Sequence, residues 1–143
     1  MIPTTLDVEW IWKPHDSVEA IWIDVVKFEY LWQEDHPDFY IGPGGENGVD
    51  GRYERFGRFL HDRGGKGILM SEITLLKRRN RHGKEVDAAN FVDGGHRFSW
   101  MRDHGARALP VVVSLSFVDE AKRLLSTDSR VCRVRYWPPE TPA

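Results

Sequence analysis

Hydrophobic and polar residues alternate along much of this chain with the two-residue period of a half-buried strand. The clearest case is residues 5–12, where apolar Leu6, Val8, Trp10 and Trp12 occupy every second position and polar Thr5, Asp7 and Glu9 precede the first three. Similar short apolar runs, bounded by Gly, Pro, Asp or Ser, predict further strands at 17–24, 67–76, 90–92, 109–115 and 130–137. The run 109–115 is almost continuously apolar, which is typical of a strand covered on both faces.

Between these strands, apolar residues recur at helical spacing. The predicted helices cover residues 25–32, 52–60, 96–104 and 117–125. The predicted buried face of helix 52–60 consists of Tyr53, Phe56, Phe59 and Leu60. Ser116, with Asp119 three residues later, predicts a capping box at the start of the last helix. The order of elements predicts an α/β fold: one domain over residues 1–137, a small mixed sheet with flanking helices, and a disordered tail at 138–143.

Composition narrows the class of protein. A length of 143 residues suits one domain, and 41% hydrophobic with 29% charged residues indicates a soluble globular protein. No apolar run is long enough to span a bilayer, and no signal peptide is recognisable. Cys132 is the single cysteine, which excludes an internal disulfide and favours a cytoplasmic location. A net charge of −2 gives no overall attraction to nucleic acid, so any such attraction must be local.

A basic run, KRRNRHGK, occupies residues 77–84 between two predicted strands. Its polar and glycine residues predict an exposed hairpin loop. One interpretation is a solvated turn. The other is a finger that contacts DNA phosphates and contributes to binding but not to the fold. Its candidate DNA-binding residues are Lys77, Arg78, Arg79 and Arg81.

A glycine-rich segment at 42–51 precedes the helix predicted at 52–60. It does not fit the spacing of a Walker A loop. A flexible surface insertion is the preferred interpretation, and a functional loop is the alternative. Three arginines on the following helix, Arg52, Arg55 and Arg58, face either a polyanion or solvent.

The most informative stretch is DGGHR at residues 93–97, between a predicted strand and a predicted helix. A helix start offers unpaired N–H groups and a positive dipole end, so it attracts anions. Gly94 and Gly95 would admit a ligand to the backbone, and His96 and Arg97 would close over its phosphate. These four residues are the predicted nucleotide-binding set. The alternative is a tight turn whose His-Arg pair lies in solvent.

Catalytic candidates surround this step. Asp93 could hold a divalent metal such as Mg²⁺ or orient a water, and His96 and Arg97 could assist the chemistry. Glu72 on the preceding strand is the second metal candidate. Asp103 and His104 are weaker candidates, because residues at a helix end more often cap it or balance its dipole.

The segment FVDGGHRFSWMRDHGARALPVVV, residues 91–113, resembles the second conserved box of the ParB/sulfiredoxin superfamily. Within it, GGHRFSWMRDHGARALPV is similar to the pattern of plasmid fertility-inhibition factors of the oncogenic-suppression type, with Gly95 in place of the usual arginine. IWIDVVKFEYLW and RYERFGRFL also resemble upstream segments of that group, so the likeness covers residues 21–115.

The resemblance implies a ParB/sulfiredoxin-like fold and a factor that blocks conjugative or T-DNA transfer through a type IV secretion route. It implies ATP as substrate, with ATPase and DNase activity, and as partners the transferred DNA strand and the coupling protein. Sulfiredoxin activity is rejected because Gly95 stands where its catalytic cysteine would be, and too little chain follows Leu115 for the further domains of ParB. The alternative is a non-catalytic protein that blocks the secretion machinery, with Trp12, Trp32 or Trp137 as anchors for a partner.

Overall fold

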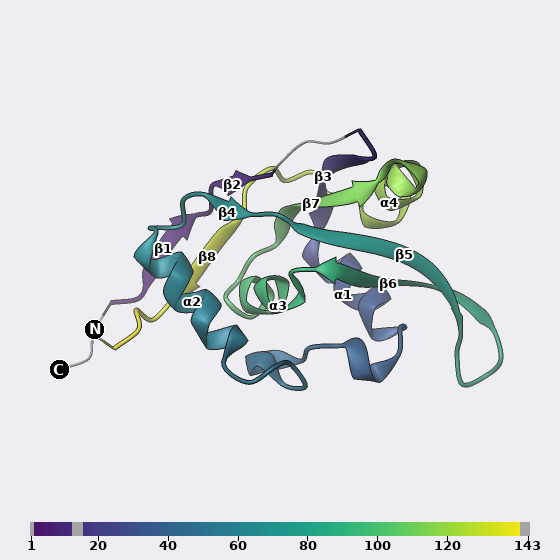
Figure 1. Ribbon diagram of the computed structural model, residues 1–143, viewed down its shortest axis with the longest axis horizontal. Helices are drawn as coiled ribbons and strands as arrows, with labels where there is room; N and C mark the ends of the chain where they lie inside the picture. The colour runs from purple at the N-terminus through teal and green to yellow at the C-terminus, as the bar shows by residue number, and fades with distance from the viewer. Residues whose placement is uncertain (1, 13–15, 141–143) are drawn as a thin grey trace.

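The computed structural model describes residues 2–12 and 16–140 of the chain. They form a single small α/β domain (Figure 1). The helices are α1 (Val25–Gln33), α2 (Arg52–Asp62), α3 (Gly95–Asp103) and α4 (Val118–Leu125), with 3-10 turns η1 (Pro37–Phe39), η2 (Pro43–Gly45) and η3 (Leu115–Phe117). The strands are β1 (Thr4–Asp7), β2 (Trp10–Ile11), β3 (Val18–Asp24), β4 (Ile68–Leu69), β5 (Ser71–Arg79), β6 (Glu85–Asp93), β7 (Ala108–Ser114) and β8 (Arg133–Tyr136).

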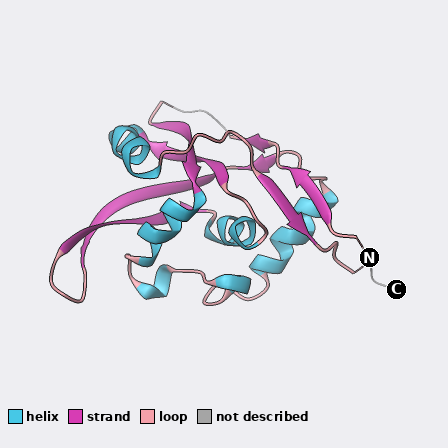
Figure 2. Cartoon of the chain, turned by 180° about the vertical axis from the view of Figure 1, so that it is seen from behind, coloured by secondary structure: helices cyan, strands magenta, loops and turns pink. Residues whose placement is uncertain are grey.

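The central sheet has four strands in the order β3-β7-β5-β6 and is mixed. β7 pairs antiparallel with β3 and parallel with β5, while β5 and β6 form an antiparallel hairpin. The predicted α/β class and small mixed sheet are therefore confirmed. Two small ribbons, β1 with β8 and β2 with β4, lie beside this sheet (Figure 2).

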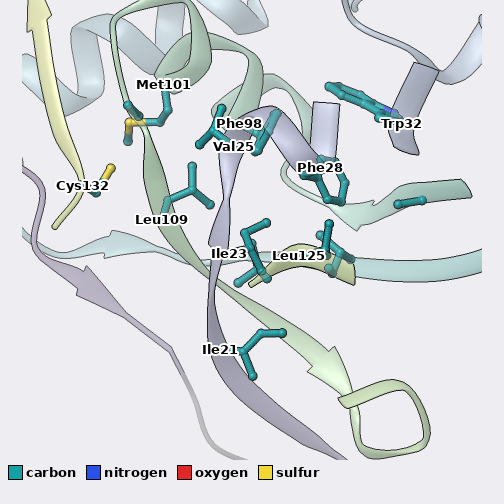
Figure 3. Packing of buried hydrophobic residues seen from close by; sticks show 14 of the residues in the cluster. Ile21, Ile23, Val25, Phe28, Trp32, Phe98, Met101, Leu109, Leu125 and Cys132 are labelled. Atoms are coloured by element: carbon teal, nitrogen blue, oxygen red, sulfur yellow. The ribbon is translucent and has the colours of Figure 1, made fainter. Parts of the chain in front are cut away.

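The core lies between the central sheet and the helices that pack on it. α1 contacts β3 and β6, α3 contacts β5 and α2, and α4 contacts β3 and β7. Figure 3 shows side chains from these elements converging, among them Ile23 of β3, Phe28 of α1 and Leu109 of β7. The helical spacing of Val25, Phe28, Leu31 and Trp32 predicts that they share one face of α1; Val25, Phe28 and Trp32 are buried, and Leu31 is partly buried against the core. β7 is buried along almost its whole length, as its apolar sequence predicts.

Two local predictions for the helices are wrong. The apolar spacing predicts Phe59 on the buried face of α2, but Phe59 is 45% exposed, because Gly57 occupies the buried side next to Leu60. A Cβ at Gly57 would stand 2.5 Å from Nε1 of Trp100, so glycine allows α2 to approach α3 closely. The predicted capping box of α4 also fails, because η3 precedes the helix and Phe117 is its N-cap residue. The Ser116 hydroxyl instead pairs with that of Ser114 at 3.0 Å.

The tail predicted at 138–143 is covered only in part. Residues 138–140 have no regular secondary structure, and residues 141–143 lie outside the described range. No helix within 2–12 and 16–140 is long and apolar enough to cross a membrane.

Candidate functional site

The predicted strand–turn–helix step is present, and Gly94 makes its turn. β6 ends at Asp93, Gly94 takes a φ of 90°, and α3 begins at Gly95. The first hydrogen bond inside the helix runs from Phe98 N–H to the Gly94 carbonyl at 3.1 Å. The N–H groups before Phe98 are therefore the ones that a helix start leaves for an anion. A Cβ at Gly94 would stand 2.3 Å from the Ser71 hydroxyl, so a side chain is excluded there.

A pocket of about 530 Å³ opens beside this helix start. We call it the arginine pocket. Its lining residues are Arg52, Arg55, Phe56, Phe59, Gly67, Leu69, Asp93, Gly94, His96 and Arg97. Three guanidinium groups thus face one carboxylate. Among the residues that the structure describes, Arg52, Arg55 and Arg97 form no ion pair. The pocket therefore carries uncompensated positive charge.

Arg97 lines this pocket and is partly buried. Its guanidinium donates to the Ser71 hydroxyl at 3.4 Å, and that hydroxyl donates to the Gly94 carbonyl at 2.9 Å. Burial lowers the pKa of Arg97, and attraction from Asp93 opposes the shift. A partly desolvated guanidinium whose hydrogen-bond partner is a neutral hydroxyl gains more from an arriving anion than one in water.

His96 lines the arginine pocket, and its role in closing over a phosphate stays a prediction. Its Nε2 accepts a hydrogen bond from Val49 N–H at 2.8 Å, so this nitrogen carries no proton. Burial, followed by the charge of Arg52, lowers the pKa of His96. The neutral imidazole therefore holds the glycine-rich segment, and only Nδ1 remains to donate to a ligand.

The glycine-rich segment 42–51, which we call the glycine loop, is held on α3 at several points. Gly44 N–H donates to Asp103 Oδ2 at 2.8 Å, and the Ser99 hydroxyl donates to the Gly42 carbonyl at 3.3 Å. Tyr53 of α2 donates to the same Asp103 oxygen at 2.8 Å. The loop lies on the surface as predicted, but these contacts argue against a flexible insertion.

Asp103 is the centre of this attachment and does not cap α3. Its other oxygen accepts from Arg102 Nε at 2.9 Å, and Arg102 also contacts Glu29 of α1 at 3.1 Å. Although burial alone would raise it, the pKa of Asp103 is lowered, because hydrogen bonds from Arg102, Tyr53 and Gly44 favour the carboxylate. Sequence analysis missed Arg102 and Glu29. His104 does act as expected, since its Nδ1 lies 2.7 Å from the Trp100 carbonyl at the helix end.

The predicted metal candidates lie on neighbouring strands. Glu72 of β5 pairs in register with Asp93 of β6, but only Asp93 lines the arginine pocket. Within the described ranges, no three His, Cys, Asp or Glu side chains come together as a metal site. Mg²⁺ often takes only one or two carboxylates when substrate phosphates supply further ligands. Asp93 fits that limited role. Gly95 does not line the pocket, because it faces Ile41 and Phe91.

The basic run extends from the strands into the tip of the β5–β6 hairpin, at the end far from α3 (Figure 1). The predicted hairpin is confirmed, but two of its cations are paired. Arg78 Nε contacts the buried Asp35 carboxylate at 2.7 Å, and Lys77 pairs with Asp87. Arg78 therefore contributes to the fold, contrary to the expectation for this run. Arg79 donates to the Gly83 carbonyl at 2.9 Å, and Arg81 lies in the turn. DNA binding by this run stays a prediction.

Trp32, a candidate anchor, and Cys132, the single cysteine, are both buried. Trp32 is 1% exposed and belongs to the core, so it cannot anchor a partner, whereas Trp137 is 60% exposed. Cys132 is also buried, and burial raises the pKa of its thiol to about 12. Such a thiol is unreactive at neutral pH.

No protein-family model matches this chain, and no curated protein or solved structure shows significant similarity to it.

Proposed function

We propose that this chain binds a nucleotide, ATP in the first instance, by its phosphates in the arginine pocket and hydrolyses it. The observation that carries the proposal is the meeting of three guanidinium groups with the start of α3 in one pocket. Cations near a helix N-terminus oppose the dipole and are stabilised there when an anion binds. The partly buried Arg97 would lie deepest, with Arg52 and Arg55 toward the entrance.

In this proposal the pocket supports phosphoanhydride hydrolysis mainly by positioning and charge. A water oxygen would attack the terminal phosphorus, the bond to the bridging oxygen would break, and the arginines would stabilise the charge on both sides. Asp93 would orient that water or hold Mg²⁺, which when bound would neutralise further phosphate charge. His96 would donate a hydrogen bond to a phosphate oxygen from Nδ1, because its Nε2 already accepts a hydrogen bond from Val49 N–H.

The wider role follows from the resemblance and is also a proposal. The order β6, Gly-Gly, α3, β7 agrees with the box from which we infer a ParB/sulfiredoxin-like fold. On that basis we propose a cytoplasmic, plasmid-encoded fertility-inhibition factor that cleaves DNA and blocks conjugative or T-DNA transfer. A plasmid-nicking assay with and without Mg²⁺ tests the DNase part.

One observation favours the non-catalytic alternative. The arginine pocket has a single carboxylate, and its histidine already has a structural hydrogen bond. These groups would be enough for a protein that binds nucleotide without hydrolysing it. Such a protein would block the secretion coupling machinery by direct contact. Phosphate release by the purified chain separates the two functions, and Asp93→Asn should abolish that release if Asp93 orients the water.

The test of the site itself is nucleotide binding by calorimetry. Arg97→Ala should weaken binding by roughly ten- to a hundredfold, since a charge-assisted hydrogen bond contributes about 1.5–3 kcal/mol. The matched control is Arg58→Ala, which removes an exposed α2 arginine that does not line the pocket. Equal affinity of the parent and Arg97→Ala would refute the phosphate site.

A further inference from the structure

A second basic hollow lies at the opposite end of α3 from the arginine pocket. A pocket of about 400 Å³ is lined by Arg107, Arg133 and Arg135, together with Thr5 and His104. An adjoining pocket of about 420 Å³ shares Arg135 and His104 and adds Trp137. We call Arg107, Arg133, Arg135 and Trp137 the arginine–tryptophan surface. Along α3, Arg97 of the arginine pocket and Asp103 of the adjoining pocket are six residues apart, or about 9 Å of helix.

Alternation along β8 produces this surface. Val134 and Tyr136 point into the core, so Arg133 and Arg135 point outward from the β1–β8 ribbon. Trp137 continues the outward series and is 60% exposed. Arg107, exposed on the connection between α3 and β7, lines the same pocket as Arg133 and Arg135. Guanidinium groups and an indole ring thus line one concave strip.

The charge of this strip is largely uncompensated. Arg133 contacts Asp7 at 2.8 Å, but in the part of the chain that the structure describes neither Arg107 nor Arg135 forms an ion pair. The Asp103 carboxylate also lines the adjoining pocket, but it already accepts hydrogen bonds from Arg102, Tyr53 and Gly44 of the glycine loop.

The end of α3 does not repel an anion strongly, because its carbonyls are engaged. His104 Nδ1 lies 2.7 Å from the Trp100 carbonyl, and Ala106 N–H donates to the Met101 carbonyl at 3.0 Å. Arg135 N–H donates to the His104 carbonyl at 2.8 Å. The negative end of the helix dipole is therefore largely satisfied where the surface begins.

We propose that the arginine–tryptophan surface binds single-stranded nucleic acid. Arg107 and Arg135 contact successive backbone phosphates, and a base stacks on the exposed ring of Trp137. A duplex is a poorer ligand, since its bases present no free face to the indole. The surface shares no residue with the arginine pocket and does not depend on nucleotide hydrolysis.

Fluorescence anisotropy with a labelled oligothymidylate of roughly 12 nucleotides tests the proposal, a length within the site sizes of single-strand-binding folds. Arg107→Gln combined with Arg135→Gln should weaken binding at least tenfold and flatten the salt dependence by about 1.4, at about 0.7 per phosphate contact. The control, Arg58→Gln with Lys66→Gln, removes the same charge from exposed positions outside the surface. Equal losses in the two double variants would overturn the proposal.

Trp137 distinguishes stacking from simple charge. Trp137→Ala should weaken oligothymidylate binding roughly 5- to 100-fold, whereas Trp137→Phe should retain most of it. Binding of an abasic oligonucleotide should be the same in parent and Trp137→Ala. Parental affinity of Trp137→Ala for oligothymidylate, or equal affinity of the parent for duplex, would overturn the single-strand proposal. Arg97→Ala should bind oligothymidylate with the affinity of the parent. The oligothymidylate result can therefore be interpreted even if the arginine pocket does not bind nucleotide.

Discussion

Asp103→Ala should destabilise the protein by about 2–4 kcal/mol. The carboxylate, whose side chain is 15% exposed, accepts hydrogen bonds from Gly44, Tyr53 and Arg102 at 2.8, 2.8 and 2.9 Å. A hydrogen bond to a charged group contributes about 1.5–3 kcal/mol, and such contributions add incompletely within a network. In this variant Arg102 still has its ion pair with Glu29, so most of the lost stability comes from the hydrogen bonds that Gly44 and Tyr53 no longer make.

Urea unfolding followed by circular dichroism measures this loss. A domain with a total stability of roughly 5–15 kcal/mol should remain folded after it. The control, Asp128→Ala, removes an exposed carboxylate and should change stability by less than about 0.5 kcal/mol. Tyr53→Phe should cost about 1 kcal/mol in the parent and much less beside Asp103→Ala, because the two side chains share one hydrogen bond. A loss below 0.5 kcal/mol in Asp103→Ala would refute the role of this carboxylate in holding the loop.

Arg78→Ala should lower the free energy of unfolding by about 1–3 kcal/mol, less than for a fully buried ion pair because Arg78 is 46% exposed. Arg79→Ala should change the free energy of unfolding by less than about 0.5 kcal/mol. Thermal unfolding measures both effects. Asp35→Asn, added to Arg78→Ala, should restore part of the lost stability. Similar melting temperatures for the two arginine variants would contradict a stabilising role for the Arg78–Asp35 ion pair. The pKa of His96 is lowered in the folded state. Its contribution to the stability of the fold is therefore fully present above the unfolded pKa of about 6.5 and is lost as the pH falls through the folded pKa. His96→Gln supplies a non-titrating acceptor, so its melting temperature should fall less than the parent's between about pH 7.5 and pH 5; an equal fall would exclude His96 as the cause.

The sequence was a good guide where one physical signal decides the structure. The helical spacing of apolar residues located α1 and α3, and a continuous apolar run located β7. The basic run marked the turn of the β5–β6 hairpin. The glycine pair correctly marked the turn from β6 into α3. Phe59 was misassigned because periodicity does not show that α2 approaches α3 through Gly57, which moves the buried face around the helix.

The side-chain contacts around the arginine pocket and the basic run join segments that are far apart in the sequence, so the sequence alone does not predict them. Nothing near His96 in the sequence indicates Val49, which is 47 positions away, and the Arg78 partner Asp35 is 43 positions away. Arg52 and Arg55 were noted as facing either a polyanion or solvent, and only the packing of α2 beside α3 brings them next to Arg97. Charge and turn chemistry are local and can be predicted. The partner of each charged group is set by the tertiary fold and cannot.

The burial of Cys132 makes the chain convenient to label. The thiol is buried and its pKa is raised by that burial, so a maleimide should react with it very slowly at pH 7. A single introduced thiol would then be the only reactive one, with no need to replace Cys132. At Arg81→Cys, on the exposed hairpin tip, a dye would report on what approaches β5 and β6. At an exposed position of the glycine loop, the same dye would report whether that loop leaves α3 when a ligand binds.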